Sequence, residues 1–108
     1  MIDPHMLTMM STKHHFAAGV YIKQMRLKRG HYAETHEHNY DHFGLLGAGE
    51  AVVELDGSCK VHIGPCIVLI EAGKKHKITA LTDIEWFCIH ATDETDPEKV
   101  DAVLIKGD

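Results

Sequence analysis

The sequence lacks any apolar run long enough to cross a bilayer, since the longest, residues 66–70, has only the length of a strand. It also lacks the continuous apolar segment of a secretory signal, because Asp3, Pro4 and His5 interrupt the start of the chain. Both absences argue against a membrane partner and against export. We therefore expect a cytoplasmic protein.

Basic residues are scarce relative to acidic ones. The chain has 11 Lys and Arg against 16 Asp and Glu, which gives a formal net charge of −5 at pH 7. Binding to nucleic acid needs a basic face that neutralises phosphates. The sequence therefore argues against a nucleic-acid partner.

Cysteine is also scarce, with an odd count of three and no CxxC spacing. This pattern argues against a disulfide framework and against a zinc finger. We expect Cys59, Cys66 and Cys88 to be small, buried, apolar side chains.

The remaining composition is that of one globular domain, with 108 residues of which 44% are hydrophobic and 25% charged. We expect a poorly patterned and partly vector-derived leader at 1–19, a β domain at 20–92 and a helical segment at 93–108. Asp96 can cap the helix, and Pro97 suits its first turn.

Short apolar segments separated by turns fill the β domain. The expected strands are residues 20–27, 45–55, 60–63, 66–70, 76–81 and 84–90. Ala51 and Val53 alternate with Glu50 and Glu54, as on a half-buried strand. The pair at 56–57, Asp-Gly, predicts a hairpin turn. Many short strands at intervals of roughly ten residues predict an all-β sandwich or barrel.

Histidine is the abundant residue, at 10 of 108. His36 and His38 are two apart, so both imidazoles leave the same face of a strand. His42 lies a further even step along, and His76 begins a later apolar strand where it can point inward. Imidazole suits transition metals, and the absence of cysteine ligands argues against a closed structural zinc site. We therefore predict a site for one divalent ion (iron, manganese, nickel, copper, cobalt or zinc).

The spacing of these histidines resembles the first motif of the cupins, G-x5-H-x-H-x3-E-x6-G. Gly30, His36, His38, His42 and Gly49 match every spacing of that motif, with histidine in place of the usual glutamate.

The second cupin motif, G-x5-P-x-G-x2-H-x3-N, is matched less closely. Gly64, Gly73 and His76 are recognisable, although one extra residue lies between Gly64 and Gly73. Glu71 stands where proline is usual, and Ala80 where asparagine is usual.

The resemblance covers about residues 20–90 and implies a cupin β-barrel, a jelly-roll-like double-stranded β-helix, with a short C-terminal helix after it. It also implies a homodimer. On the family's pattern the metal ligands are His36, His38, His42 and His76. For His42 an alternative is a buried histidine beside a three-ligand site.

The exchange of glutamate for histidine alters the charge of the predicted site. Four neutral imidazoles leave a divalent ion with its full charge of two, whereas a glutamate removes one unit. The ion therefore becomes more electrophilic and binds anionic ligands more readily.

Two classes of function follow from such a site. The first is a small metalloenzyme (oxygenase, lyase, isomerase or cyclase) that acts on an oxygenated or anionic metabolite. Tyr40 is its candidate catalytic residue, because a phenol near the ion can move a proton; the alternative is an aromatic core or turn residue. The second class is a non-catalytic module that binds or senses a small molecule.

Other polar residues have weaker assignments. His90 shares a face with Trp86 and is interpreted as a hydrogen-bonded core histidine rather than a ligand or proton shuttle. Lys74, Lys75 and Lys77 form either a solvated loop or a cationic rim that attracts an anionic substrate.

Overall fold

The computed structural model describes residues 10–35 and 40–92 of the 108-residue chain. These residues form nine strands and no helix. The strands are β1 (Met10–Ala17), β2 (Val20–Leu27), β3 (Tyr32–Thr35), β4 (His42–Ala48), β5 (Glu50–Leu55), β6 (Ser58–Ile63), β7 (Cys66–Ile70), β8 (His76–Ala80) and β9 (Ile84–Ala91). The all-β prediction is confirmed, and the predicted C-terminal helix lies outside the described residues. No helix in the described part is long and apolar enough to cross a membrane.

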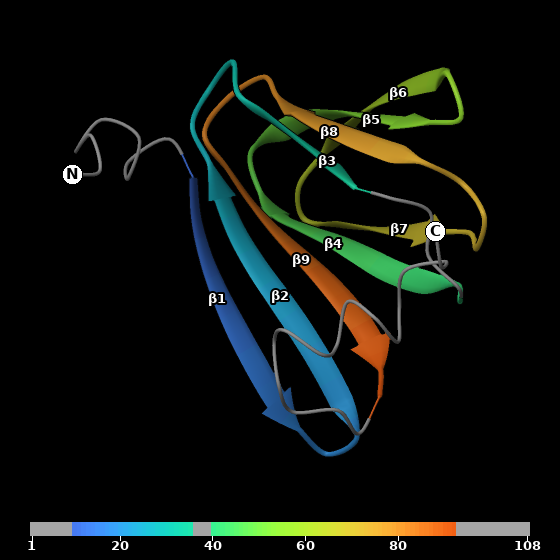
Figure 1. The fold of residues 1–108 in the computed structure, drawn as a ribbon. Helices are drawn as coiled ribbons and strands as arrows, with labels where there is room; N and C mark the ends of the chain where they lie inside the picture. The colour runs from blue at the N-terminus through green and yellow to red at the C-terminus, as the bar shows by residue number, and fades with distance from the viewer. Residues whose placement is uncertain (1–9, 36–39, 93–108) are drawn as a thin grey trace, which may run out of the picture.

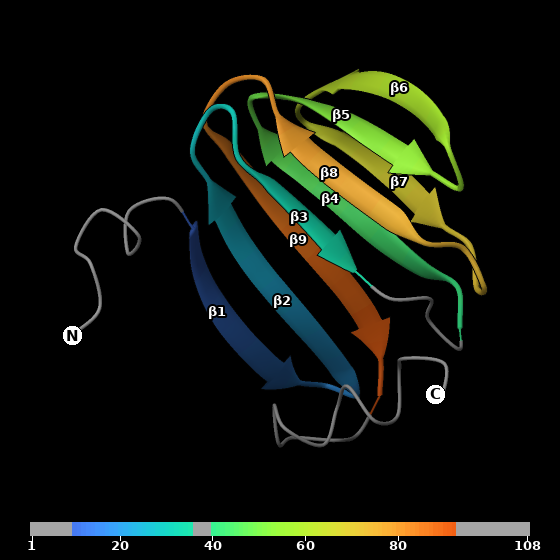
Figure 2. The same cartoon turned by 45° about the horizontal axis from the view of Figure 1, so that its top comes forward.

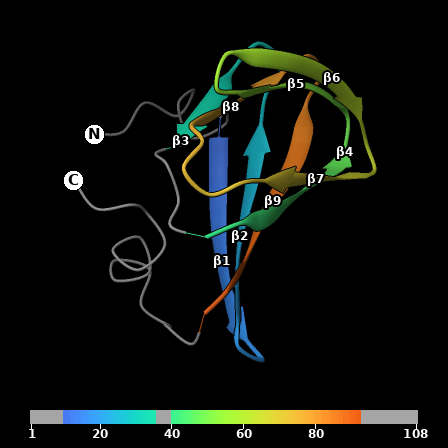
Figure 3. The same ribbon diagram turned by 90° about the vertical axis from the view of Figure 1, so that its right-hand side faces the viewer.

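Two antiparallel sheets face each other across the interior (Figures 1 and 2). The first sheet has the strand order β1-β2-β9-β4-β7, and the second has the order β3-β8-β5-β6. Neighbouring strands are far apart in the sequence, as β2 and β9 show, so most pairing is non-local. The hairpin end of β1 and β2 extends beyond the second sheet (Figure 3).

Alternating side chains explain why these segments pair as half-buried strands. On β9, Trp86 and Cys88 are buried while their neighbours Glu85, Phe87 and Ile89 are partly exposed. Most buried apolar positions of both sheets meet in one core, and Tyr21 packs separately against Phe16. Its fully buried members of largest volume are Trp86, Leu27, Leu46, Ile70, Ile78 and Val53.

The predicted hairpin at residues 56–57 is confirmed. Leu55 pairs with Ser58, and both turn residues have positive φ, 47° at Asp56 and 85° at Gly57. Glycine and aspartate tolerate this left-handed conformation, and a two-residue turn of this kind matches the twist of the flanking strands. The turn therefore fixes the register of β5 and β6.

The expected strands differ from the structure at three places, the first of which is β3 (Tyr32–Thr35), a strand that was not predicted. The single strand expected at 45–55 is divided by Gly49, whose φ of 90° ends β4 in one sheet and begins β5 in the other. In addition, β1 occupies much of the segment expected to be an unpatterned leader at 1–19. Its sequence is too polar to signal a strand, and it forms because all eight of its residues pair with β2.

Candidate metal centre

Two of the four predicted ligands meet between the sheets. His42 is the first residue of β4 in one sheet, and His76 is the first residue of β8 in the other. Both side chains are buried, with 4% and 2% of their surface exposed. Their ring centroids lie 5.8 Å apart, and the ring planes are tilted by 53°. Residues 34 positions apart in the sequence thus become neighbours in the interior.

The separation of these two rings is compatible with binding to one ion. With metal–nitrogen bonds of about 2.0–2.1 Å, each ring centroid lies about 3.2 Å from the ion. Two such centroids are roughly 4.5 Å apart at a ligand angle of 90° and roughly 6.4 Å apart at 180°. The observed 5.8 Å between His42 and His76 falls within this range.

His36 and His38 lie outside the described residues. The chain enters their segment from Thr35, whose Cα partner is His76, and is described again from Tyr40, two residues before His42. The segment that carries both histidines therefore starts beside one member of the buried pair and ends beside the other. Within residues 10–35 and 40–92 alone, no group of three His, Cys, Asp or Glu side chains is arranged to hold an ion.

His90 joins the buried pair from β9. Its ring stacks on that of His42, with centroids 4.3 Å apart and planes 29° apart. The lone pairs of an imidazole lie in the plane of its ring, so two stacked rings direct them nearly parallel rather than toward one ion. Since only 6% of His90 is exposed, it packs as a buried support for His42, consistent with its interpretation as a core residue.

A row of rings continues from His90 across the first sheet. His90 pairs with Tyr21 on β2, their ring centroids 5.8 Å apart, and Tyr21 pairs with Phe16 on β1, 4.8 Å away. The Tyr21 hydroxyl lies 2.7 Å from His14 Nδ1. This row was not predicted, because the polar segment that forms β1 gives no strand signal in the sequence.

An open groove of about 520 Å³ adjoins His76. Its lining contains Glu34, Glu54, Asp56, Gly57, Lys75, His76 and Lys77. Three carboxylates and two ammonium groups thus give this groove a formal charge of −1. The predicted cationic rim is therefore balanced by acidic side chains.

Two of the three predicted rim lysines are also engaged with partners. Lys77 Nζ lies 3.9 Å from Glu34 Oε1 and 4.2 Å from the centroid of the Tyr32 ring. Lys74 Nζ lies 3.4 Å from Glu71 Oε1. These contacts favour the interpretation of the lysines as part of a solvated surface.

Tyr40, the candidate catalytic residue, lies two positions before His42 with 60% of its surface exposed. The side chain is therefore accessible to solvent, and its catalytic role stays a prediction.

The cysteines divide into three environments. Cys88 is buried, and burial raises the pKa of its thiol. Cys66 is half-buried, with its Sγ 3.7 Å from His62 Nδ1. The expectation of burial is wrong for Cys59, which is exposed on β6, an edge strand whose side chains are mostly solvated.

Several solved structures with the same architecture are cupins. A cupin 2 domain-containing protein from Halorhodospira halophila is 17% identical, with a TM-score of 0.70 over 90% of this chain and 77% of that one. A cupin superfamily protein from Desulfitobacterium hafniense is 21% identical, with a TM-score of 0.68 and 78% of each chain covered. The cupin domain of an XRE family transcriptional regulator from Enterobacter cloacae is 16% identical, with a TM-score of 0.65 over 75% of this chain and 94% of that one.

No protein-family model matches the sequence, and no curated protein matches it. At these low identities the structural likeness establishes the fold. The chain therefore has the cupin fold, as the spacing of its histidines and glycines predicted.

Proposed function

We propose that this chain holds one divalent transition-metal ion through His36, His38, His42 and His76 and acts as a small metalloenzyme on an oxygenated metabolite. The observation that supports this most is the buried pair of His42 and His76, contributed by opposing sheets at a ring separation suited to one ion. The segment carrying His36 and His38 begins and ends beside this pair, which makes a four-histidine set geometrically accessible.

Four imidazoles fit iron, manganese, nickel, copper, cobalt or zinc, and such an ion supplies Lewis-acid or redox chemistry when bound. The protein's part is to hold the ligands and to limit access of water. His90 stacks on His42 and restricts the orientation of its ring. Cys88, two residues before His90, is also buried, so the interior beside the site is largely shielded from solvent.

A substrate with oxygen atoms suits this site, because a divalent transition-metal ion binds carbonyl, hydroxyl or carboxylate oxygens. The groove that adjoins His76 is lined by Glu34, Glu54 and Lys77 on the outer side of the second sheet, opposite to the buried pair, so its charges do not select the substrate of the proposed metal site. Tyr40 Oη is the candidate group for moving a proton, since its phenol is exposed near the start of β4.

The metal site is tested by elemental analysis of protein that carries no added histidine tag. We expect about one equivalent of metal in the parent chain and its loss in His76→Ala and in His36→Ala/His38→Ala. The matched control is His15→Ala, which removes an exposed imidazole on β1 that is hydrogen-bonded to Gln24 and is no proposed ligand. Absence of metal from the parent, even after reconstitution, would exclude the metal site.

A second candidate is a binding or sensing module without turnover. It is favoured by the likeness to the cupin domain of a transcriptional regulator, because this chain covers 94% of that domain. The two functions are separated by incubating metal-loaded protein with candidate oxygenated metabolites and following both binding and product by NMR. A ligand that binds through the metal but is recovered unchanged supports the module, whereas a new product supports the enzyme.

A further inference from the structure

A hydrogen-bonded pair on the first sheet connects the buried Tyr21 to the protein surface. The Tyr21 hydroxyl lies 2.7 Å from Nδ1 of His14. The two ring planes are 15° apart, which suits a hydrogen bond in the plane of the imidazole, where the lone pair of its nitrogen lies. Tyr21 is only 2% exposed, whereas His14 is exposed. The buried phenol is therefore hydrogen-bonded to a group that can take up a proton and exchange it with water.

The ring of Tyr21 also faces inward, toward the predicted metal ligands. The rings of Tyr21 and His90 have centroids 5.8 Å apart and planes 15° apart. His90 in turn stacks on His42 at 4.3 Å. Electrons tunnel readily between aromatic rings in such close succession. Tyr21 therefore lies between a proton acceptor at the surface and a path for electrons into the interior.

We propose that Tyr21 is a redox-active residue, which gives up one electron toward His42 while its proton moves to His14. Loss of an electron makes a phenol hydroxyl strongly acidic, so its oxidation is favoured by a base within hydrogen-bond reach. The 2.7 Å between Tyr21 Oη and His14 Nδ1 meets this requirement. His14 accepts the proton in the tautomer whose own proton is on Nε2.

The step balances with hydrogen peroxide as the oxidant, and this acceptor rests on the proposed function. Tyr21 supplies one of the two electrons that break the O–O bond, and a redox-active divalent ion on the proposed ligands supplies the other as its charge rises from two to three. Two protons from the solvent complete the conversion of the peroxide to two molecules of water. Tyr21 becomes a neutral phenoxyl radical, and His14 becomes an imidazolium that later releases its proton to water.

This arrangement directs oxidation away from the proposed ligands. Imidazole is harder to oxidise than phenol, so the electron is lost from Tyr21 rather than from His90 or His42. The resulting radical is shielded from the solvent, because Tyr21 is 2% exposed. The pair of Tyr21 and His14 therefore protects the ligand histidines from damage by peroxide.

The other two of the three tyrosines have different surroundings. Tyr32 and Tyr40 are 57% and 60% exposed. Lys77 Nζ lies 4.2 Å from the centroid of the Tyr32 ring, and this positive charge opposes removal of an electron from the ring. The double variant Tyr32→Phe/Tyr40→Phe leaves Tyr21 as the only tyrosine, and it serves as the background for all measurements.

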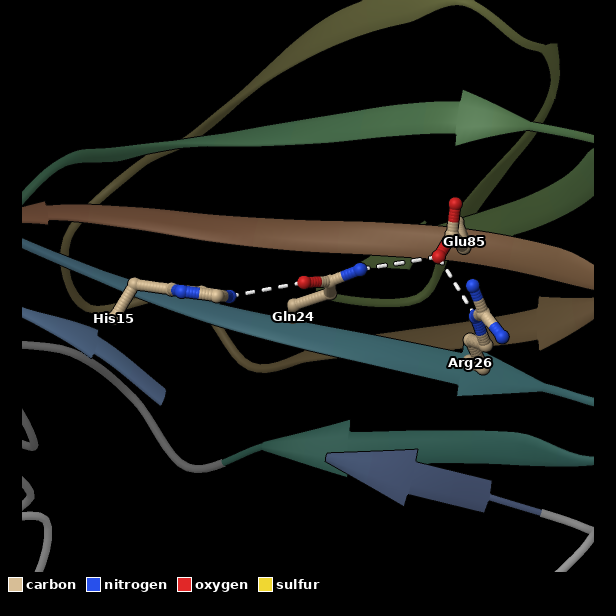
Figure 4. A network of polar contacts seen from close by, with 4 residues as sticks. All are labelled: His15, Gln24, Arg26 and Glu85. Atoms are coloured by element: carbon tan, nitrogen blue, oxygen red, sulfur yellow. Dashed lines mark hydrogen bonds and ion pairs between the residues drawn. The ribbon is translucent and has the colours of Figure 1, made fainter. Parts of the chain in front are cut away.

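His15 provides the matched control for His14. The two residues are adjacent on β1, so their side chains leave opposite sides of the strand. His15 Nε2 lies 2.9 Å from Gln24 Oε1, in a network that continues from Gln24 to Glu85 (Figure 4). Because this network lies on the other side of the sheet from Tyr21, loss of His15 should leave the oxidation of Tyr21 unchanged.

The proton transfer is tested first, in metal-free protein. A flash-generated tris(bipyridine)ruthenium(III) complex serves as the one-electron oxidant, and transient absorption follows the phenoxyl radical. We expect a radical at Tyr21 that forms more slowly in heavy water. Adding His14→Phe, which keeps an aromatic ring, should lower the rate about 100-fold, whereas adding His15→Phe should not change it. In His14→Ala, which serves if the phenylalanine variant does not fold, free imidazole should restore the rate.

The path toward His42 is tested in the same background loaded with ferrous iron. Hydrogen peroxide is added, and electron paramagnetic resonance is recorded after rapid freezing. We expect a tyrosyl radical that is lost on adding Tyr21→Phe and weakened on adding His90→Leu, which removes the ring between Tyr21 and His42. The His76→Ala variant, which lacks a proposed ligand, is the blank for iron free in solution.

Each part of the inference has a result that overturns it, and circular dichroism establishes that every variant is folded. A rate unchanged in both His14→Phe and His14→Ala, or lowered equally by His15→Phe, overturns the proton transfer. A tryptophanyl signal in place of the tyrosyl one, or no radical in iron-loaded protein, overturns the role of Tyr21 and leaves the metal site intact. Protein that binds no metal in elemental analysis overturns the acceptor, whatever the photochemical result.

Discussion

The space between the two sheets has an apolar end and a histidine end, and the same strands build both. β4, β8 and β9 each contribute to both ends, as the pairs His42 and Leu46, His76 and Ile78, and His90 and Trp86 show. All six side chains are buried, although three are apolar and three are titratable. Strand geometry determines which positions point inward. The residue type at each of these positions then determines whether the inward side chain is polar or apolar.

The two ends differ in role, because the apolar end stabilises the fold whereas the histidine end carries the groups that can bind an ion. At the apolar end, burial alone is favourable by about 1.5–3 kcal/mol for each large side chain. At the histidine end, burial of polar rings costs free energy unless their nitrogens have partners. The apolar end should therefore contribute more to the free energy of unfolding than the histidine end does.

The largest expected change in the free energy of unfolding comes from a substitution at the apolar end. Trp86 is fully buried, so Trp86→Ala should lower the free energy of unfolding by about 3–5 kcal/mol through lost burial and a cavity. Urea denaturation measured in the presence of a chelator tests this, with His76→Ala as the control. An equal loss in chelated His76→Ala would show that the two ends do not differ.

The second effect is confined to the histidine end. If the chain binds metal, a free concentration of 100 times the Kd should raise the free energy of unfolding by about 2.7 kcal/mol. His76→Ala should lose this gain, while Leu46→Ala should keep it despite a lower baseline. The measurement is denaturation with and without added metal. A gain in His76→Ala that matches that of the parent would contradict the assignment of this ligand.

A smaller effect is expected where the two ends meet. Gly44 lies on β4 between His42 and Leu46, and a Cβ there would overlap the Trp86 ring. Gly44→Ala should cost about 1–3 kcal/mol as Trp86 is displaced. At Gly47 the nearest atom, Phe87 Cε2, would lie 3.0 Å from a Cβ, so Gly47→Ala is the milder matched control. Thermal unfolding of both variants measures the difference, and equal losses would contradict the close approach of Gly44 to Trp86.

The smallest effect lies outside both ends, at the exposed pair of Arg26 and Glu85. The hydrogen bond from Arg26, followed by that from Gln24, lowers the pKa of Glu85 below its ordinary 4.5. Its stabilisation is therefore present above pH 4.5 and is lost as the pH falls through the lowered pKa. For a surface pair we expect less than about 1 kcal/mol.

Urea denaturation of the parent and Glu85→Gln between pH 7 and pH 3 checks this prediction. The difference between the two proteins should shrink as the pH falls, since a protonated carboxyl resembles the amide. A difference that grows on acidification would contradict the sign of the pKa shift.

Much of the fold could be predicted from the sequence because local signals were strong. The strands expected at 20–27 and 66–70 coincide with β2 and β7, and the turn at 56–57 forms as predicted. β1 was missed because its residues carry no apolar alternation, although its partner β2 follows directly in the sequence after a two-residue turn. Gly49 was part of the recognised motif, yet its role in ending β4 depends on its positive φ.

The candidate site was predictable to a lesser extent. The spacing of the motif singled out His42 and His76, and both are buried together. The stacking of His90 on His42 was not accessible, because alternation shows which face a residue occupies and not which ring it contacts. Likewise, the lysines around His76 suggested a cationic rim until Glu34 and Glu71 were placed beside them.

By itself the sequence determined the class of fold, the inward positions of most strands and the presence of a histidine cluster, because period-two patterns and turn residues act over a few positions. The tertiary structure alone decided which residues meet across the sheets. It brought His76 beside His42 and stacked His90 on His42. These contacts depend on non-local strand pairing, which no short stretch of sequence specifies.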